Sequence, residues 1–166
     1  MSRPVLYIFA KAPIMGQAKT RLARDIGPSH AKRIYRAMMA RVLRQTRDPR
    51  WDTVLAVTPS RALGQVPDWD GTAQIPQVSG SLSPRLAAIF NRKGPTLVIG
   101  TDCPEVNATD IATAIRLLKS HAVVFGPASD GGFWLMGANG PLRPDFFDGI
   151  RWSHEQTLSD VADRTD

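Results

Sequence analysis

The stretch VLYIFAKAP, residues 5–13, decides the fold class. Its first six residues form a continuous apolar run, which ends at a lysine, an alanine and a proline. A strand that is apolar on both sides is typical of a parallel sheet whose two faces are covered by helices. Residues 5–10 are therefore predicted to form a buried strand, and the chain beyond them is expected to alternate helices with strands.

The rest of the chain continues this alternation. Apolar runs bounded by turn residues predict further strands over residues 51–58, 74–78, 97–100, 122–125 and 133–136. Helical spacing and start signals predict helices around residues 34–43, from Ser83-Pro84 to Phe90, from Asn107 or Thr109 to Ser120, and from Trp152-Ser153 onward, where Gln156 gives a capping-box spacing. Such an order implies a largely parallel sheet that binds ligands at the carboxyl ends of its strands.

Length and composition set the class of protein. With 166 residues, 43% of them hydrophobic, residues 1–166 are expected to form a single globular domain. No apolar run is long enough to span a bilayer and the start of the chain lacks a signal-peptide layout, so no membrane partner and a cytoplasmic location are expected. Cys103 is the single cysteine, which excludes an internal disulfide, and no histidine motif marks it as a nucleophile.

The chain is basic, with a formal charge of +6. Much of the excess lies between residues 21 and 50, where helical spacing puts Arg33, Arg36, Arg44 and Arg47 opposite an apolar face. A solvated helix face explains these arginines. A surface for single-stranded nucleic acid would interleave aromatic residues with the charges, and only Tyr35 lies in the helix, on its apolar side. Nucleic acid is therefore disfavoured as a partner.

The loop after the first strand is cationic and contains glycine. It reads KAPIMGQAKTRL, residues 11–22, with Lys11, Gly16, Lys19 and Arg21, and it runs into a predicted helix. Backbone N–H groups and the dipole at a helix start favour a phosphate there. The spacing is not that of a P-loop, and a surface loop with scattered lysines stays open as the alternative.

Two aspartates follow predicted strands. Asp102 comes after the strand at 97–100, and Asp130 lies in GPASDGGFWLMG, residues 126–137, before Gly131 and Gly132. Aspartate is also common in turns, which is the plain alternative for each. Carboxylates held at neighbouring strand ends and facing a cationic loop would suit a metal-bound diphosphate.

Four stretches carry a resemblance to a known family: FAKAPIMGQAKTRL at 9–22, IGTDCPE at 99–105, GPASDGGFWLMG at 126–137 and FFDGIRWS at 146–153. In order and spacing they resemble a bacterial glycosyltransferase-like family, labelled as a domain of unknown function and related to nucleotide-diphospho-sugar transferases. Relatives of that family include 2-phospholactate guanylyltransferase and the molybdenum-cofactor guanylyltransferase. The resemblance implies a GT-A-like (Rossmann-like) three-layer α/β/α sandwich with a mostly parallel mixed sheet, a nucleotide or nucleotide-sugar ligand, and Mg²⁺ or Mn²⁺.

The resemblance also implies roles for individual residues. The nucleotide-binding residues would be Lys11, Ala12, Pro13, Gly16, Lys19, Arg21 and Arg85. Asp102 and Asp130 would hold the metal, and together with Lys19 they would be the catalytic residues. Gly131, Gly132, Trp152 and Ser153 would line the pocket of a small-molecule acceptor.

The chain departs from the family pattern in its third loop and at its end. The loop GSLSPRL, residues 80–86, keeps Arg85 but has Ser81 and Ser83 where the family usually has an acid and a second glycine. His154 stands in place of the usual threonine, and the resemblance leads us to expect a C-terminus shorter than is usual in the family. A missing strand would leave an open sheet edge, which a second copy in a homodimer could cover.

Three hypotheses follow. The first is a metal-dependent transferase that moves a nucleotidyl group, or a sugar from a nucleotide sugar, onto an unidentified acceptor. The second is a nucleotide-binding protein of the same fold that has lost catalysis, which the altered third loop motivates. The third, motivated by charge alone, is a nucleic-acid-binding protein.

Overall fold

A computed structural model describes residues 2–17 and 19–165. Its centre is a six-stranded sheet in the order β3-β2-β1-β4-β6-β5. The strands are β1 (Val5–Lys11), β2 (Asp52–Thr58), β3 (Ala73–Pro76), β4 (Thr96–Ile99), β5 (Val123–Pro127) and β6 (Phe133–Ala138). Neighbours among β1 to β4 pair in parallel, and β6 runs antiparallel to both β4 and β5. This confirms the predicted mixed, mostly parallel sheet.

The strand β1 lies in the middle of the sheet and is buried on both faces. Leu6 and Ile8 are fully buried in one hydrophobic cluster, whereas Tyr7 and Phe9 pack against the cluster on the opposite face. Its register with β2 runs from Val5 opposite Asp52 to Lys11 opposite Thr58. The apolar run at residues 5–10 therefore predicted this strand correctly.

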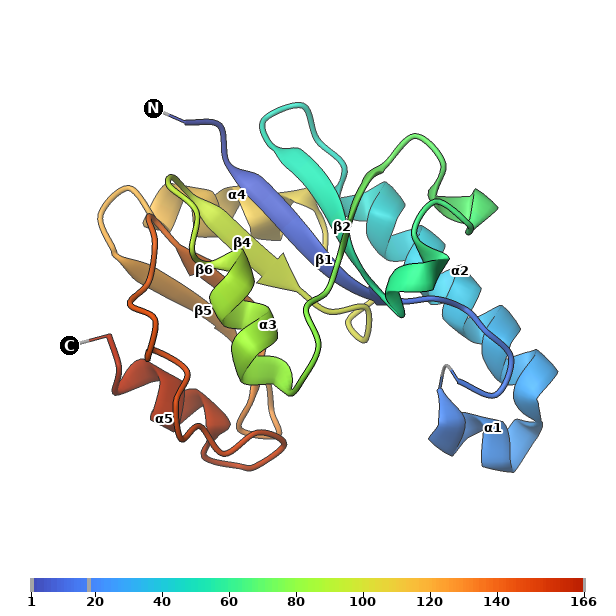
Figure 1. The fold of residues 1–166 in the computed structure, drawn as a ribbon. Coiled ribbons are helices and arrows are strands. Elements are labelled where there is room, and N and C mark those ends of the chain that lie inside the picture. Colours follow the sequence, from blue (N-terminus) through green and yellow to red (C-terminus); the bar gives the residue numbers. More distant parts are fainter. Residues whose placement is uncertain (1, 18, 166) are drawn as a thin grey trace.

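Helices cover both faces of the sheet. They are α1 (Thr20–Ile26), α2 (Pro28–Thr46), α3 (Leu82–Ile89), α4 (Ala108–Leu117) and α5 (Thr157–Ala162), with the 3₁₀ helices η1 (Ser60–Ala62) and η2 (Pro67–Trp69). α2 and α4 contribute to one hydrophobic cluster, and α3 and α5 contribute to the other. Figure 1 shows α3 and α5 in front of the sheet and α4 behind it, which is the predicted three-layer α/β/α sandwich.

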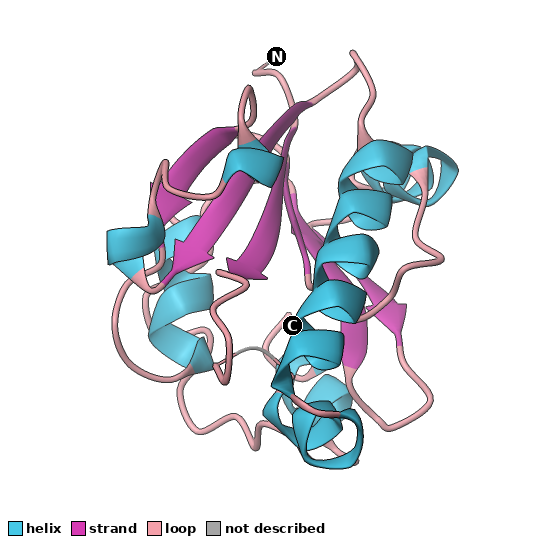
Figure 2. Ribbon diagram, turned by 90° about the vertical axis from the view of Figure 1, so that its right-hand side faces the viewer, coloured by secondary structure: helices cyan, strands magenta, loops and turns pink. Residues whose placement is uncertain are grey.

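The helix α2 is the longest in the described residues, and its start extends past the sheet together with α1 (Figures 1 and 2). None of the seven residues of α1 is buried. Gly27, at a φ of 85°, reverses the chain between the two helices, a conformation that glycine adopts without steric cost. No helix in the described part of the chain is both long and apolar enough to cross a membrane.

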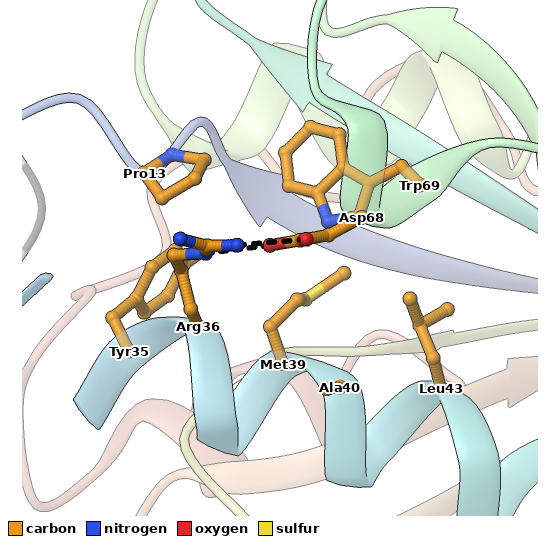
Figure 3. A pocket seen from close by; sticks show the side chains of 8 residues that line it. All are labelled: Pro13, Tyr35, Arg36, Met39, Ala40, Leu43, Asp68 and Trp69. Atoms are coloured by element: carbon orange, nitrogen blue, oxygen red, sulfur yellow. Dashed lines mark hydrogen bonds and ion pairs between the residues drawn. The ribbon is translucent and has the colours of Figure 1, made fainter. Parts of the chain in front are cut away.

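The outer face of α2 carries the predicted arginines, and one of them fixes a neighbouring segment. Arg33, Arg36, Arg44 and Arg47 are exposed, as expected for a solvated face. Arg36 donates two hydrogen bonds to the Asp68 carboxylate, at 2.6 and 2.8 Å, which Figure 3 shows above the helix. Trp69, next in sequence, is buried at 1% exposure, so η2 is anchored on α2 by a bidentate ion pair and an indole.

The last helix starts later than the sequence suggested. Residues 152–156 form turns, and α5 begins at Thr157, so the predicted start at Trp152-Ser153 is wrong. Ser153 has a φ of 56°, in the left-handed region, which an N-cap residue does not adopt. The Thr157 hydroxyl instead accepts from the His154 N–H and lies within hydrogen-bonding distance of the Arg151 and His154 carbonyls.

The starts of α3 and α4 agree better with the sequence. α3 begins at Leu82, one residue before the predicted Ser83-Pro84. At α4 the Asn107 side chain accepts from the Thr109 N–H at 2.9 Å, and the Asp110 carboxylate accepts from the Asn107 N–H at 3.0 Å. This reciprocal capping box confirms Asn107 as the cap of the helix that follows β4.

Replacing the cap should destabilise the fold. Asn107→Ala removes the side-chain acceptor and should lower the free energy of unfolding by about 1 kcal/mol, whereas Asn107→Ser should retain most of it. Urea denaturation followed by circular dichroism measures the difference. Thr109→Ala is the matched control, because alanine keeps the backbone N–H that the Asn107 side chain accepts from and has a high helix propensity. A loss of stability in Thr109→Ala as large as that in Asn107→Ala would contradict the assigned cap.

Candidate functional site

The carboxyl ends of the parallel strands meet at one edge of the sheet, and two hollows adjoin there. The smaller one, the strand-end pocket, has a volume of about 300 Å³. Its lining residues are Phe9, Lys11, Lys19, Tyr35, Thr58, Gln77, Arg85, Thr101 and Asp102. Three cations among them face a single acid, so the strand-end pocket is net positive and suits an anion.

Tyr35 joins the strand-end pocket to α2. The helix buries its ring at 4% exposure, and its hydroxyl oxygen accepts from the Lys11 N–H at 3.0 Å. Burial raises the pKa of Tyr35, and the nearby Asp102 carboxylate raises it further, while hydrogen bonds with Thr101 and Lys11 oppose the shift. The hydroxyl therefore stays protonated and fixes the end of β1 relative to the segment after β4.

Arg85 reaches the strand-end pocket from α3. One terminal nitrogen donates to the Gln77 side-chain oxygen at 3.2 Å, and Gln77 in turn donates to the Ala56 carbonyl at 2.7 Å. The Arg85 Nε is buried and has no hydrogen-bond partner in the described residues. A buried donor without a partner costs free energy, and the Arg85 side chain lines the strand-end pocket, so Arg85 is a candidate partner for an acceptor group there.

An ion pair closes one side of the strand-end pocket. The Lys19 Nζ donates to Oδ1 of Asp102, which joins the loop after β1 to the segment after β4. Lys19 itself has a φ of 52°, in the left-handed region that non-glycine residues seldom adopt. The loop backbone is thus held in a conformation that brings this side chain onto the predicted metal-binding acid.

The larger hollow, the acidic cleft, has a volume of about 730 Å³ and shares Asp102 with the strand-end pocket. Its lining includes six predicted site residues, namely Arg21, Asp102, Asp130, Gly132, Trp152 and Ser153. The other lining residues were not predicted as site residues; they are Leu82, Gly100, Cys103, Ala128, Phe133, Trp134, His154, Glu155 and Thr157. The segments after β1, β4 and β5 therefore converge on one cleft of a size typical for ligands.

Asp130 lies in a tight turn between β5 and β6. Its Oδ1 accepts from the Gly132 N–H at 3.0 Å, and the Ala128 N–H donates to the Gly132 carbonyl at 2.9 Å. A carboxylate has about four lone-pair sites, so this bond leaves acceptor capacity on Asp130. The turn holds the carboxylate at the cleft and leaves it free to accept further hydrogen bonds or to bind a cation.

Gly131 docks that turn on the C-terminal segment. Its φ is 85°, and a Cβ at this position would collide with the Glu155 carbonyl oxygen. The Gly131 carbonyl also accepts from the Leu158 N–H at 2.9 Å. Glycine is therefore required here by a left-handed conformation and by close packing of two backbones. Gly131 supports the wall of the acidic cleft and Gly132 lines it.

Trp152 forms an aromatic wall of the acidic cleft with Phe133, whose ring centroid lies 6.3 Å away in an edge-on arrangement. The indole N–H donates to the Ser83 hydroxyl oxygen at 2.8 Å, and the Ser83 hydroxyl donates to the Phe147 carbonyl at 2.9 Å. Ser83 is one of the two departures in the third loop. Its side chain positions the tryptophan, a contact that a glycine could not make.

Cys103 lies in the acidic cleft, partly buried. Burial raises the pKa of its thiol, and the negative charges of Glu105, Asp102 and Asp130 raise it further. The thiol is thus protonated near neutral pH and is a weak nucleophile, which agrees with the absence of a histidine motif. Asp102 and Asp130 thus both act on this thiol, and both line the acidic cleft.

A metal would find few ligands from the protein itself. Within residues 2–17 and 19–165, no group of three or more histidine, cysteine or acidic side chains is arranged to hold an ion. Asp102 and Asp130 are the two carboxylates that the acidic cleft brings together among the predicted ligands. Mg²⁺ is commonly bound by one or two carboxylates together with substrate phosphates and water, so a metal here would require the substrate's oxygens.

The remaining predicted residues lie elsewhere. Ala12 and Pro13 line a third hollow on another side of the loop after β1. Gly16 adopts a φ of 76° within that loop and lines neither the strand-end pocket nor the acidic cleft. Their roles in nucleotide binding, like those of Lys11, Lys19 and Arg85, stay predictions.

Several residues of the two hollows were missed by sequence reasoning. Thr58 is the last residue of β2, Gln77 follows β3, and Thr101 precedes Asp102. The rule that ligands bind at the carboxyl ends of parallel strands would have identified them. His154 was noted only as a departure from the family pattern, and no signal marks Glu155. Their place at the acidic cleft depends on how the C-terminal segment docks.

Comparison with known proteins gives a family and a fold. Residues 40–154 match the model of a family described as "Uncharacterized protein conserved in bacteria (DUF2064)". No curated protein matches the chain.

Two solved structures share the fold. A protein from Desulfovibrio desulfuricans G20, described as a "putative nucleotide-diphospho-sugar transferase", superposes with a TM-score of 0.82 at 24% identity, over 99% of this chain and 77% of its own. Rv0371c from Mycobacterium tuberculosis H37Rv superposes with a TM-score of 0.52 at 15% identity, over 98% of this chain and 82% of its own. At these identities the likeness establishes the architecture alone.

The proximity of the two carboxylates to Cys103 is open to a chemical test. Asp102→Asn or Asp130→Asn removes a negative charge near the thiol, which lowers the thiol pKa and increases the thiolate fraction. Alkylation by iodoacetamide near pH 8 should accelerate about twofold for each variant, the size expected for one charge acting through a solvated cleft. Mass spectrometry measures the alkylated fraction over time, and this fraction reports on Cys103 because the chain has one cysteine.

The control for this experiment is Asp163→Asn, an exposed position after α5 that lines neither hollow. Its alkylation rate should equal that of the unaltered protein. An unchanged rate in Asp130→Asn would show that this carboxylate does not face the thiol, and would separate Asp130 from Asp102.

Proposed function

Because the chain belongs to the DUF2064 family of bacterial proteins, and its fold is shared with the Desulfovibrio protein, we propose that it is a metal-dependent transferase. Its donor substrate is a nucleoside triphosphate or a nucleotide sugar, and its acceptor is a small molecule. The transferase description of the Desulfovibrio protein supports the reaction class. The two adjoining hollows support the assignment of donor and acceptor sites.

One observation carries the proposal. Asp102 lies at the junction of a cationic pocket of about 300 Å³ and an acidic cleft of about 730 Å³. A transferase needs two substrates to meet at one reacting bond, with the charge of the phosphates balanced at that point. A binding protein for a single ligand would need no second cleft at the same acid.

The strand-end pocket is the proposed nucleotide site. Lys11, Lys19 and Arg85 supply positive charge for phosphate oxygens, and the unpartnered Nε of Arg85 supplies a donor. Thr58 and Gln77 supply hydroxyl and amide groups toward the sheet edge, which suit the polar edge of a base or a ribose. Arg21 approaches the same phosphates from the acidic cleft.

The proposed cation site consists of Asp102 and Asp130, completed by phosphate oxygens. Both are carboxylates, which match the oxygen preference of Mg²⁺ and Mn²⁺. When bound, the cation would neutralise phosphate charge and stabilise the leaving group. Asp130 is held ready by the Gly132 N–H, and Asp102 is held by Lys19.

Two reactions are compatible with this arrangement. In nucleotidyl transfer, an oxygen of the acceptor phosphate bonds to the α-phosphorus, the bond from that phosphorus to its bridging oxygen breaks, and pyrophosphate leaves with the electron pair. In glycosyl transfer, the acceptor hydroxyl oxygen bonds to the anomeric carbon, a nucleoside diphosphate leaves, and the hydroxyl proton passes to a carboxylate or to water. Lys19 and Arg21 would stabilise the departing phosphates in both. Kinship with guanylyltransferases, as the four sequence stretches imply, would favour the first.

A second candidate function is nucleotide binding without turnover. The third loop has Ser81 and Ser83 where the family usually has an acid and a glycine, and Ser83 is engaged with Trp152. If the lost acid is needed for the reaction, the strand-end pocket would still bind a nucleotide. The two candidates differ in turnover and agree in binding.

Thermal unfolding with a panel of ligands tests both candidates. ATP, GTP, CTP, UTP, UDP-glucose and GDP-mannose are each added with and without MgCl₂. We expect at least one of them to raise the Tm only when Mg²⁺ is present, by roughly 5–10 °C at a hundredfold excess over its Kd. Asp102→Asn should abolish the Mg²⁺-dependent part of the shift, and Asp163→Asn should preserve it. A panel without any response would refute the transferase and the binding protein alike.

Product release separates the two candidates once a ligand is known. With that ligand and Mg²⁺, water acts as a slow substitute acceptor, and a transferase should release pyrophosphate or a nucleoside diphosphate over hours. Asp102→Asn should lose this release. Binding without any release, including in the presence of sugar phosphates as trial acceptors, would favour the protein that has lost catalysis.

A further inference from the structure

A third hollow, the loop pocket, lies behind the loop that follows β1. Its volume is about 580 Å³, and it shares no lining residue with the acidic cleft or the strand-end pocket. Three segments form its walls: residues 12–15 of the loop, one side of α2, and residues 61–68 around η1 and η2. Its size falls within the range of about 300–1,000 Å³ typical of small-molecule sites.

The floor of the loop pocket is apolar. Ala12, Ala62 and Val66 line it and are buried at 1%, 6% and 9% exposure. Met15 stands at the rim with 56% of its surface exposed, the highest value among the exposed large hydrophobic side chains. A flexible thioether at an open apolar hollow adapts readily to an apolar ligand. Covering this apolar surface with a ligand would remove it from water, which is favourable.

The charges of the loop pocket are unequal. Arg36 forms a bidentate pair with Asp68 between α2 and η2 (Figure 3), and both residues line the loop pocket. Arg36 lowers the pKa of Asp68, so that carboxylate stays ionised and the pair is neutral. Lys32 and Arg61 also line the loop pocket and form no ion pair with the described residues. Two positive charges therefore remain uncompensated.

We propose that the loop pocket is a second ligand site, which binds a small amphipathic anion. The ligand would place a carboxylate, sulfonate or phosphate monoester between Lys32 and Arg61 and an apolar ring or short acyl group on Ala12, Ala62 and Val66. None of its lining side chains is aromatic. A nucleobase would thus find no stacking partner in the loop pocket, and the site selects a different ligand class from the nucleotide proposed for the strand-end pocket.

The aromatic sulfonate 1-anilinonaphthalene-8-sulfonate is a suitable probe, because it combines one negative charge with an apolar body and fluoresces when bound. Titration should give saturable binding to the unaltered protein. Lys32→Gln combined with Arg61→Gln removes both charged donors and should weaken binding about tenfold or more. The double variant Arg116→Gln and Lys119→Gln, at exposed positions of α4 and its end, is the matched control and should bind as the unaltered protein does.

The location of the probe is read from the methionine methyl groups. With ¹³C-methyl methionine, the NMR signal of the Met15 methyl group should shift on addition of the probe. The signal of Met136 should not shift, because Met136 is fully buried in the hydrophobic cluster on the opposite face of the sheet. Met15→Glu places a negative charge at the rim and should weaken binding, while its exposure leaves the fold intact. Equal affinity in the Lys32/Arg61 double variant, or an unmoved Met15 signal with probe bound, would overturn the proposal.

The loop pocket and the proposed transferase site are tested separately. Asp102→Asn should leave probe binding unchanged, because Asp102 does not line the loop pocket. All substituted side chains lie at least partly at the surface, so each variant should fold. Circular dichroism of each variant checks this. Loss of probe affinity in Asp102→Asn would place the probe at the nucleotide site and reject a distinct one.

Discussion

The strand β1 is buried on both faces and hydrogen-bonded along both edges, and the rest of the molecule is arranged around that constraint. A buried peptide group without a partner costs free energy comparable to a lost hydrogen bond, so β1 needs a strand on each edge. β2 pairs with it in parallel from Val5 to Lys11, and β4 pairs with it in parallel from Val5 to Ile8. The three strands then end at the same edge, and the segments after β1 and β4 bring Lys19 into contact with Asp102. The candidate site is therefore a consequence of how the sheet satisfies its central strand.

The parts of this arrangement that were predictable depend on short-range patterns. Every strand was predicted to within a few residues. The prediction was clearest for β1 and β4, because a strand buried on both faces is a continuous apolar run, whereas the short β3 is only partly buried. The Asn107 cap was recognisable because its partners are Thr109 and Asp110, two and three residues away. The convergence of Asp102, Asp130 and Arg21 on one cleft followed from a topological rule: carboxyl ends of parallel strands share an edge.

The unpredicted parts depend on contacts between distant residues. Ser83 and Trp152 are 69 residues apart, and a serine gives no signal that its hydroxyl will accept from an indole so far along the chain. Tyr35 was interpreted as a core residue of its helix, and its ring is indeed buried; what spacing does not reveal is that its hydroxyl supports the end of β1. Ser153 has the left-handed φ that delays α5, a conformation imposed by the docking of residues 151–157 and absent from local propensity. The altered third loop thus acquires a structural role that comparison of sequence patterns alone would count as a loss.

The Lys19–Asp102 pair explains how one acid could serve both as a structural contact and as a cation ligand. The Asp102 side chain is 78% exposed and that of Lys19 is 27% exposed, so the pair is solvated and contributes no more than about 1 kcal/mol. A polyphosphate in the strand-end pocket would offer Lys19 an anion of higher charge, and its cation would offer Asp102 a divalent partner. Exchanging both partners at once leaves neither charge unpaired, which avoids the larger cost of isolating a charge. The ion pair therefore orders the loop after β1 without opposing the ligand that the site is proposed to bind.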